Sequence, residues 1–205
     1  MNRFSIIVPA YNSEKYIRKG LDSIKAQDFT DYELIVVCDS CKDNTYNIAK
    51  EYTDKVFNVS NNSVGATRNN GLDKVTGEYV LFMDDDDWFL HEFAFSLLDI
   101  KLKSDPNIDV LAFSFIWANR GYAQPLSNGG KLYPSVWNKC WRSSMLSKSR
   151  FPAKTYDEEP LFMRDVFERH PNIKVIAWDT PLYYYNFLRP GSVCDKLNQE
   201  GKIDY

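Results

Sequence analysis

The sequence predicts an α/β protein in which helices flank a mostly parallel central sheet. Three observations support this class. Strand-like and helix-like segments alternate from residue 4 to about residue 104. The strand-like segments are nearly continuous apolar runs, which is typical of strands that are covered on both faces. Polar clusters follow three of these segments, as expected where parallel strands end at a common ligand-binding edge.

The first half contains short apolar runs separated by segments with apolar residues at helical spacing. In chain order, we expect strands over residues 4–9, 32–37, 55–59 and 78–83, and helices after Ser13, after Asp43 or Asn44, and over residues 65–74. The second half is less regular. Here we expect helices over residues 90–103, 136–146 and 159–168, strands over residues 108–115, 173–177 and 182–187, and a loop over residues 121–130.

Composition limits the possible functions. The net charge is -3, the pI is near 5.5 and no dense block of lysine and arginine is present, so a nucleic-acid partner is disfavoured. No stretch approaches the ~18 apolar residues that a membrane span needs, and no secretory leader is visible, so we expect a cytoplasmic protein. Cys38 and Cys41 form a CxxC, but no second pair stands at zinc spacing, so zinc or redox use is disfavoured.

Four consecutive aspartates follow the fourth expected strand, in the stretch FMDDDDWF at residues 82–89. Neighbouring carboxylates repel one another and are costly to bury unless a positive charge neutralises them. A hard divalent cation such as Mg²⁺ or Mn²⁺ would do so, and it could bridge the phosphates of a nucleotide. A solvated acidic turn is the other interpretation.

Two more polar positions stand at expected strand ends. Asp39 ends the second strand, where a carboxylate could accept hydrogen bonds from a base or a ribose. A simple turn or a helix cap would also explain it. Tyr11 follows Pro9 and could stack on a base, or it could be an ordinary surface tyrosine.

Several stretches together resemble glycosyltransferase family 2. They are SIIVPAYNSEKY (5–16), LIVVCDSCKDNT (34–45), GATRNNG (65–71) and GEYVLFMDDDDW (77–88), in the family's order and spacing. Two later stretches, VWNK (136–139) and PLYYYNFLRPGS (181–192), are similar to members that build bacterial capsules, lipopolysaccharide or other exopolysaccharides. The resemblance implies the Rossmann-like GT-A fold. It also implies inverting transfer of a sugar from a nucleotide-sugar, expected to be a UDP-sugar, to a glycan or lipid-linked glycan.

The resemblance also implies residue roles within a single domain over residues 1–205. About residues 1–104 would bind the donor, and about residues 105–205 would form the acceptor side. The residues expected to bind the nucleotide-sugar are Pro9, Tyr11, Asp39, Arg68, Asp84 and Asp85. Asp86 is expected to be the principal ligand of Mn²⁺ or Mg²⁺, with Asp84 or Asp85 contacting ribose or metal. Without the family resemblance, an exposed arginine on a helix is an equally good interpretation of Arg68.

The expected catalytic base lies in the stretch DEEPLF at residues 157–162. Family members usually have a Glu-Asp pair before a helix, and the Asp is the proposed base. Here Glu159 stands at that position, so we expect it to be the base, with Glu158 and Asp157 as alternatives. Because glutamate is one methylene longer, the acceptor would lie farther away, or activity would be weak or lost. An acidic first helical turn is the non-catalytic interpretation.

Three other functions were weighed. A phosphatase of the haloacid dehalogenase type is disfavoured because three strands come before the strand that leads into the aspartates, and Trp88 follows them. A sugar nucleotidyltransferase is disfavoured because the first loop lacks glycines and basic residues. A non-catalytic, nucleotide-sugar-binding partner subunit with a degenerate acceptor site is the main alternative, and sugar turnover would discriminate it. Peripheral membrane association, through a lipid-linked acceptor at the inner face, is an expectation from the family.

Overall fold

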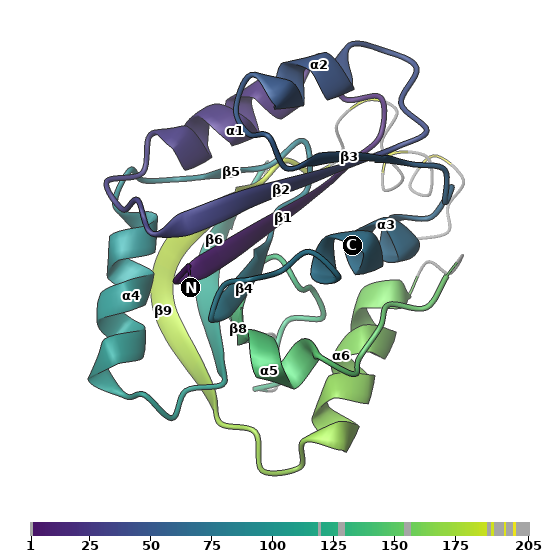
Figure 1. Ribbon diagram of the computed structural model, residues 1–205. Helices are drawn as coiled ribbons and strands as arrows, with labels where there is room; N and C mark the ends of the chain where they lie inside the picture. Colours follow the sequence, from purple (N-terminus) through teal and green to yellow (C-terminus); the bar gives the residue numbers. More distant parts are fainter. Residues whose placement is uncertain are drawn as a thin grey trace.

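The computed structural model describes residues 2–118, 120–126, 130–153 and 157–187, together with residues 190, 195 and 199. Within these residues a nine-stranded sheet lies between two groups of helices (Figure 1). The strands are β1 (Phe4–Ala10), β2 (Tyr32–Asp39), β3 (Val56–Val59), β4 (Tyr79–Phe82), β5 (Trp88–Phe89), β6 (Val110–Trp117), β7 (Gly121–Ala123), β8 (Lys139–Arg142) and β9 (Val175–Tyr185). The helices are α1 (Ile17–Lys25), α2 (Thr45–Lys50), α3 (Val64–Leu72), α4 (Ala94–Ser104), α5 (Ser143–Leu146) and α6 (Glu158–Arg169).

The expected α/β class is confirmed, and the sheet is parallel through its first half. The strand order is β3-β2-β1-β4-β8-β6-β9-β5, with β7 paired to β6. The pairs β2–β3, β1–β2 and β1–β4 are parallel. Beyond β4 the sheet is mixed, because β8 runs antiparallel to both β4 and β6, whereas β6 and β9 are parallel.

Both faces of the sheet are covered, as the unbroken apolar runs predict. Ile6 and Val8 of β1 belong to a buried cluster that includes side chains of α1 and α4. Ile7, between them, belongs to a second cluster that includes Phe162 and Val166 of α6. In Figure 1, α1 and α2 lie along the top of the sheet, whereas α3, α5 and α6 lie on the opposite side.

The predicted helix over residues 136–146 is wrong in its first part. Residues 139–142 form β8, and only the last four residues are helical, as α5. Trp137, Cys140 and Trp141 have helical spacing, which explains the error. Because β8 is inserted between β4 and β6, its residues Lys139, Cys140 and Trp141 are all fully buried, and no polar alternation marks the strand.

Three smaller corrections concern the same half. The helix predicted from residue 90 begins at Ala94, because Trp88–Phe89 pairs with β9 as strand β5. The two strands expected over residues 173–177 and 182–187 are one strand, β9, whose register against β6 shifts around Ser114. The loop expected over residues 121–130 begins with strand β7, and residues 127–129 lie outside the described part of the chain.

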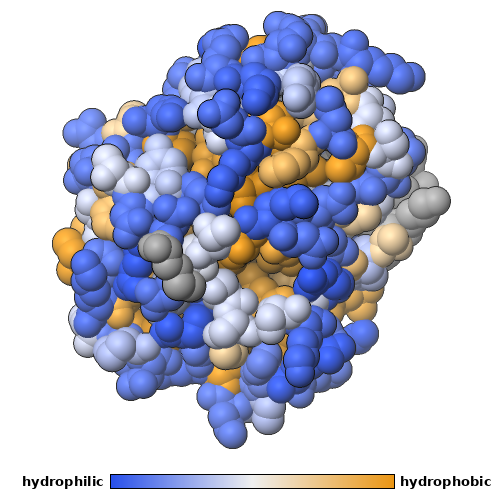
Figure 2. All heavy atoms as spheres, in the orientation of Figure 1, coloured by the Kyte–Doolittle hydropathy of each residue, from blue (hydrophilic) through white to orange (hydrophobic). Residues whose placement is uncertain are grey.

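The face of the molecule that Figure 1 presents is mainly polar. Figure 2 shows hydrophilic side chains over most of this face, with apolar side chains visible in a furrow across its middle. No helix in the part of the chain that the structure describes is long and apolar enough to cross a membrane.

Candidate active site

The carboxyl ends of the parallel strands bring the predicted donor residues to one edge of the sheet. β1 ends at Ala10, β2 ends at Asp39, and the aspartates follow β4 directly. The backbone N–H of Tyr11 donates to Oδ2 of Asp85 at 3.0 Å, so the segment after β1 is tied to the segment after β4. The ring of Tyr11 is 58% exposed at this edge.

Arg68 of α3 joins carboxylates from two distant parts of the chain. Its guanidinium nitrogens lie 2.8 Å from Oδ1 of Asp84, 3.1 Å from Oε1 of Glu158 and 2.7 Å from Oε1 of Glu159. The Arg68 side chain is only 3% exposed, so the alternative interpretation of an exposed helix arginine is excluded, and nucleotide binding by Arg68 stays a prediction. Three carboxylates held by one buried cation form a compact charged cluster, which we call the Arg68 cluster.

A close contact between α3 and the chain before α6 makes the Arg68 cluster possible. A Cβ atom at Gly65 would lie 2.6 Å from the carbonyl oxygen of Pro152, so a side chain there would force the two segments apart. Asn69, one helical turn farther on, donates to the carbonyl of Phe151 at 2.9 Å and accepts from its N–H at 2.9 Å. These contacts bring Arg68 beside the first turn of α6.

Glu159 is held by two donors from different elements. Its Oε1 bonds to Arg68, and its Oε2 accepts the backbone N–H of Val136 at 3.0 Å. Burial raises the pKa of Glu159 from 4.5 to about 7, against the opposing effect of Arg68. A carboxylate with a pKa near neutrality is suited to accept a proton in a reaction.

The four aspartates have different environments, so a uniformly solvated turn is excluded. Asp87 is fully buried, and it accepts the hydroxyl of Tyr183 at 2.7 Å and the N–H of Asn186 at 2.7 Å. Burial and the neighbouring carboxylates of Asp86 and Asp84 raise the pKa of Asp87 well above its usual range. The same Tyr183 hydroxyl accepts the N–H of Asp84 at 3.1 Å. Strand β9 therefore fixes both ends of this turn.

Asp39 organises the segment that leads into α3. Its carboxylate accepts the N–H groups of Asn61, Asn62 and Ser63 at 2.8 to 3.1 Å, and the hydroxyl of Thr67 at 2.9 Å. Although burial opposes the change, these hydrogen bonds lower the pKa of Asp39. A nucleotide that bonded to Asp39 would therefore share the carboxylate with these four donors. Direct binding of a base or a ribose by Asp39 stays a prediction.

The remaining predicted residues lie around this edge. Pro9 is buried within β1, in register with Val37 of β2. Asp86 is partly exposed after β4. Asp157 is the exposed residue before the first turn of α6, and its side chain forms no cap hydrogen bond with the helix.

The carboxylates at this edge fit a divalent cation that shares its ligands with a substrate. Among the described residues, no group of three or more His, Cys, Asp or Glu could hold a metal by itself. Mg²⁺ is usually bound by one or two carboxylates together with substrate phosphates, so a complete protein cage is not required. Asp84 and Asp86 are both partly exposed and offer the hard oxygens that Mg²⁺ and Mn²⁺ prefer.

Two residues of the site were missed in the sequence. Tyr183 and Lys139 stand in the stretches PLYYYNFLRPGS and VWNK, for which the resemblance implies no role of either residue. The partners of Tyr183 are 96 and 99 residues away, and those of Lys139 are two backbone carbonyls and the amide oxygen of its neighbour Asn138, so no local pattern could identify either role. The one local signal is a lysine that stands next to Cys140 and Trp141 at the start of β8, because lysine is almost never fully buried without a specific partner.

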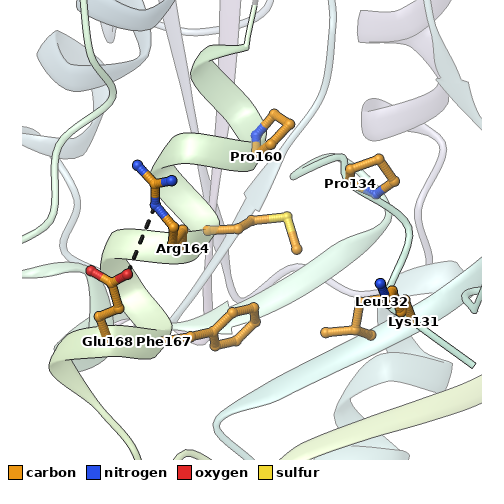
Figure 3. Close-up of a pocket in the computed structure, with 8 residues that line it drawn as sticks. Lys131, Leu132, Pro134, Pro160, Arg164, Phe167 and Glu168 are labelled. Carbon is orange, nitrogen blue, oxygen red and sulfur yellow. Dashed lines mark ion pairs between the residues drawn. The ribbon is translucent and has the colours of Figure 1, made fainter.

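A separate hollow of about 580 Å³ lies between residues 131–134 and α6 (Figure 3). Its lining is mostly apolar, with an ion pair of 3.8 Å between Arg164 and Glu168 on the helix side. None of its lining residues belongs to the Arg68 cluster. The hollow is therefore distinct from the carboxylate edge.

Comparison with known proteins gives the family. The model of glycosyl transferase family 2 matches residues 5–170. EpsH of Bacillus subtilis, described as a putative glycosyltransferase, is 28% identical over 209 residues, which cover 88% of this chain and 60% of EpsH. TarS of Staphylococcus aureus, a poly(ribitol-phosphate) beta-N-acetylglucosaminyltransferase, is 32% identical over 214 residues, which cover 93% of this chain and 36% of TarS. This chain thus spans less than two thirds of either relative's length.

Solved structures give the same result. The crystal structure of TarS 1-349 in complex with UDP-GlcNAc matches with a TM-score of 0.77 and 30% identity, over 94% of this chain and 60% of that one. Glucosyl-3-phosphoglycerate synthase from Mycobacterium tuberculosis, crystallised with Mg²⁺ and UDP, matches with a TM-score of 0.68 over 99% of this chain and 81% of that one; at 21% identity, this likeness shows the fold. The chain belongs to glycosyl transferase family 2 and has the α/β fold of GT-A glycosyltransferases.

Proposed function

We propose that this chain is the donor-binding and catalytic part of an inverting glycosyltransferase. It would transfer a hexosyl or N-acetylhexosaminyl group from a UDP-sugar to a glycan of the bacterial surface. The observation that carries the proposal is the Arg68 cluster, which brings a carboxylate that follows β4 together with the expected base at the start of α6. One edge of the sheet thereby offers groups for a nucleotide diphosphate and a group for an attacking hydroxyl.

The donor assignment rests on likeness and on the chemistry of this edge. TarS 1-349 was crystallised with UDP-GlcNAc, and the mycobacterial synthase with UDP and Mg²⁺. In this chain, Nε of Arg68 is a buried donor that has no hydrogen-bond partner among the described residues. Because an unpaired buried donor is costly, a diphosphate oxygen that accepted this N–H would stabilise the site.

Catalysis would be a single displacement at the anomeric carbon. Glu159 would take the proton of the acceptor hydroxyl as that oxygen attacks from the face opposite the nucleotide. A base of this kind typically contributes ~10²–10⁴-fold to the rate. Glu158 and Asp157, which precede Glu159 in the chain, are the alternative proton acceptors. Val136 and Arg68 would orient the Glu159 carboxylate, because they bond to its two oxygens.

A divalent cation would be held by Asp86 and Asp84. When bound, Mg²⁺ or Mn²⁺ would neutralise the charge that develops on the departing diphosphate. Asp85, tied to the Tyr11 amide, would keep the β1 and β4 ends together around the nucleotide. The exposed ring of Tyr11 would lie against the base or ribose.

The acceptor is proposed from the relatives. TarS is named for transfer to poly(ribitol-phosphate), so a glycan or a lipid-linked glycan is the expected acceptor class. A lipid-linked acceptor would bring the protein to the membrane surface as a peripheral protein.

Calorimetric titration of UDP, with and without Mn²⁺, tests the donor site. We expect metal-dependent binding by the wild type, and Asp86→Ala should weaken it by at least about tenfold, because a metal ligand is lost. Asp54→Ala, which replaces a fully exposed aspartate, is the matched control and should bind as the wild type does. Absence of binding to UDP, GDP and CMP by folded protein would refute the donor assignment.

Turnover of a panel of UDP-sugars, with Glu159→Gln as the base variant, tests catalysis. We expect hydrolysis or transfer by the wild type and at least about a hundredfold lower turnover by the variant. UDP binding without turnover of any donor would favour the alternative of a non-catalytic partner subunit. Wild-type turnover by Glu159→Gln would show that Glu158 or Asp157 is the base.

A further inference from the structure

Lys139 is a fully buried lysine whose ammonium group is bound by uncharged oxygens. It stands at the start of β8 and is 0% exposed. Its Nζ donates to the carbonyl of Tyr133 at 2.7 Å, the carbonyl of Ser135 at 2.6 Å and Oδ1 of Asn138 at 2.7 Å. The three N–H bonds of the ammonium are thereby used.

A lysine at this position needs an explanation beyond packing. Burial lowers the pKa of Lys139 from 10.5 to about 7, against the opposing effect of the Glu159 carboxylate, so the position is unfavourable for a charge. An apolar side chain of similar volume would avoid this cost. The three acceptors all come from residues 133–138, which we call the 133–138 turn. Lys139 therefore holds one short segment in one conformation.

The 133–138 turn presents the donor that holds Glu159. The N–H of Val136 donates to Oε2 of Glu159 at 3.0 Å, and the carbonyl of Val136 accepts the indole N–H of Trp141 at 3.2 Å. The hydroxyl of Ser135 bonds to Asn138 at 3.0 Å, the residue whose Oδ1 also binds Lys139. The peptide that contacts the base is thus fixed on both sides, and Lys139 bonds the turn at three points.

We propose that Lys139 is a positioning residue for the base: its ammonium fixes the 133–138 turn, and the Val136 amide of that turn aims the Glu159 carboxylate at the acceptor hydroxyl. This inference rests on the proposed function, because it requires Glu159 to be the base. It assigns a role to the VWNK stretch, whose members contribute the amide, the Asn138 acceptor and the lysine. Lys139 itself is too deeply buried to contact substrate.

The main test is a double-mutant cycle that compares the wild type, Lys139→Met, Glu159→Gln and the double variant. For each protein, kcat for UDP-sugar turnover and Kd for UDP in the presence of Mn²⁺ are measured. We expect Lys139→Met to lower kcat by about tenfold or more with Kd within about twofold, because misplacing a base slows only the chemical step. In the Glu159→Gln background, Lys139→Met should cause no further loss, because it acts through that carboxylate.

Cys140→Ala is the matched control. Cys140 is the next residue of β8 and is equally buried, but its side chain belongs to the cluster shared with α1 and α4. Its kcat should stay within about threefold of the wild type. A Lys139→Met kcat within that range, a parallel loss of UDP affinity, or an additional loss in the Glu159→Gln background would each overturn the inference.

Val136→Pro is the second variant, in case Lys139→Met does not fold. It removes the N–H that donates to Glu159 and leaves the lysine in place. We expect the same loss of kcat with UDP affinity kept, and wild-type kcat in this variant would overturn the inference. Different results would refute the proposed function itself. The wild type would then turn over no donor, or Glu159→Gln would be fully active.

Discussion

At the scale of single residues, Arg68 is the cation that pairs with all three carboxylates of the Arg68 cluster. Replacing it with methionine would leave Asp84, Glu158 and Glu159 without their common cation. Removing one partner from a buried ion pair typically costs about 3–5 kcal/mol. We expect Arg68→Met to lose about that much unfolding free energy near pH 8, and less near pH 5, where the carboxylates can take up protons.

Denaturant unfolding at the two pH values measures this effect. Arg164→Met is the control, because Arg164 is exposed and its ion pair with Glu168 is 3.8 Å long. Such surface pairs contribute about 0–1 kcal/mol. Equal losses by Arg68→Met at both pH values would argue against a charged cluster.

The ionisation of Glu159 should make the unfolding free energy of the protein depend on pH. Its pKa is about 7 in the folded protein and 4.5 as its ordinary value, so the native state holds this proton more tightly than the unfolded chain. The stability that Glu159 contributes therefore falls as pH rises from about 4.5 to about 7. Because glutamine cannot titrate, Glu159→Gln should gain stability relative to the wild type across this window.

Thermal unfolding of ligand-free protein over a pH series would measure this difference. Asp157→Asn is the comparison, because Asp157 is exposed beside the same helix. Its stability should lie within about 0.5 kcal/mol of that of the wild type, because substitutions of exposed side chains usually have small effects. A constant difference between Glu159→Gln and the wild type would show that the proton is not retained in the fold.

At the scale of elements, α3 depends on Asp39 for the conformation of the segment that leads into it. Asp39→Ala would remove the acceptor of the Asn61, Asn62 and Ser63 amides. Loss of a single capping acceptor typically costs about 0.5–2 kcal/mol. We expect faster hydrogen exchange at these three amides and at the first turn of α3, with the amides of α6 unchanged.

Hydrogen exchange followed by mass spectrometry would resolve this segment. Asp39→Asn is the conservative variant, because one amide oxygen can still accept. Its exchange should be intermediate between those of the wild type and Asp39→Ala. Unchanged exchange in Asp39→Ala would mean that the segment is held by other contacts.

The elements also explain how much could be predicted from the sequence. The strands of the first half were predicted well because each is a short apolar run, and α1 has apolar residues at helical spacing. Helix α3 has no apolar stripe, because its buried residues are Gly65, Thr67, Arg68 and Gly71. β8 was missed because a strand covered on both faces shows no alternation, and its Trp141 stands at helical spacing from Trp137, which precedes the strand. The aspartates and Asp39 were placed by their position after strands. The contacts of Arg68 with α6 span 90 residues and could not be read from any local pattern.

At the scale of the whole molecule, β8 and β9 make the two halves interdependent. β8 covers the edge of β4, and the Tyr183 hydroxyl of β9 holds the turn after β4. We therefore expect one cooperative unfolding transition. A fragment of residues 1–104 should not fold as a monomer, because its β4 edge and Asp87 would lose their partners.

Coincidence of the fluorescence and circular dichroism transitions would test cooperativity. Four of the five tryptophans lie beyond residue 104, at Trp117, Trp137, Trp141 and Trp178, so fluorescence reports mainly on the second half. Circular dichroism reports on both halves. Two separate transitions, or a stable 1–104 fragment, would show that the halves are independent domains.

The bond between Asp87 and Tyr183 also sets an order of events during synthesis. The two residues are 96 positions apart. At a translation rate of about 5–20 residues per second, the ribosome needs roughly 5–20 seconds to make Tyr183 after Asp87. During that interval the Asp87 carboxylate lacks its Tyr183 partner, and the β4 edge stays uncovered until β8 has been made. An unpaired strand edge can pair with other chains, so the growing polypeptide is exposed to aggregation during the first part of this interval.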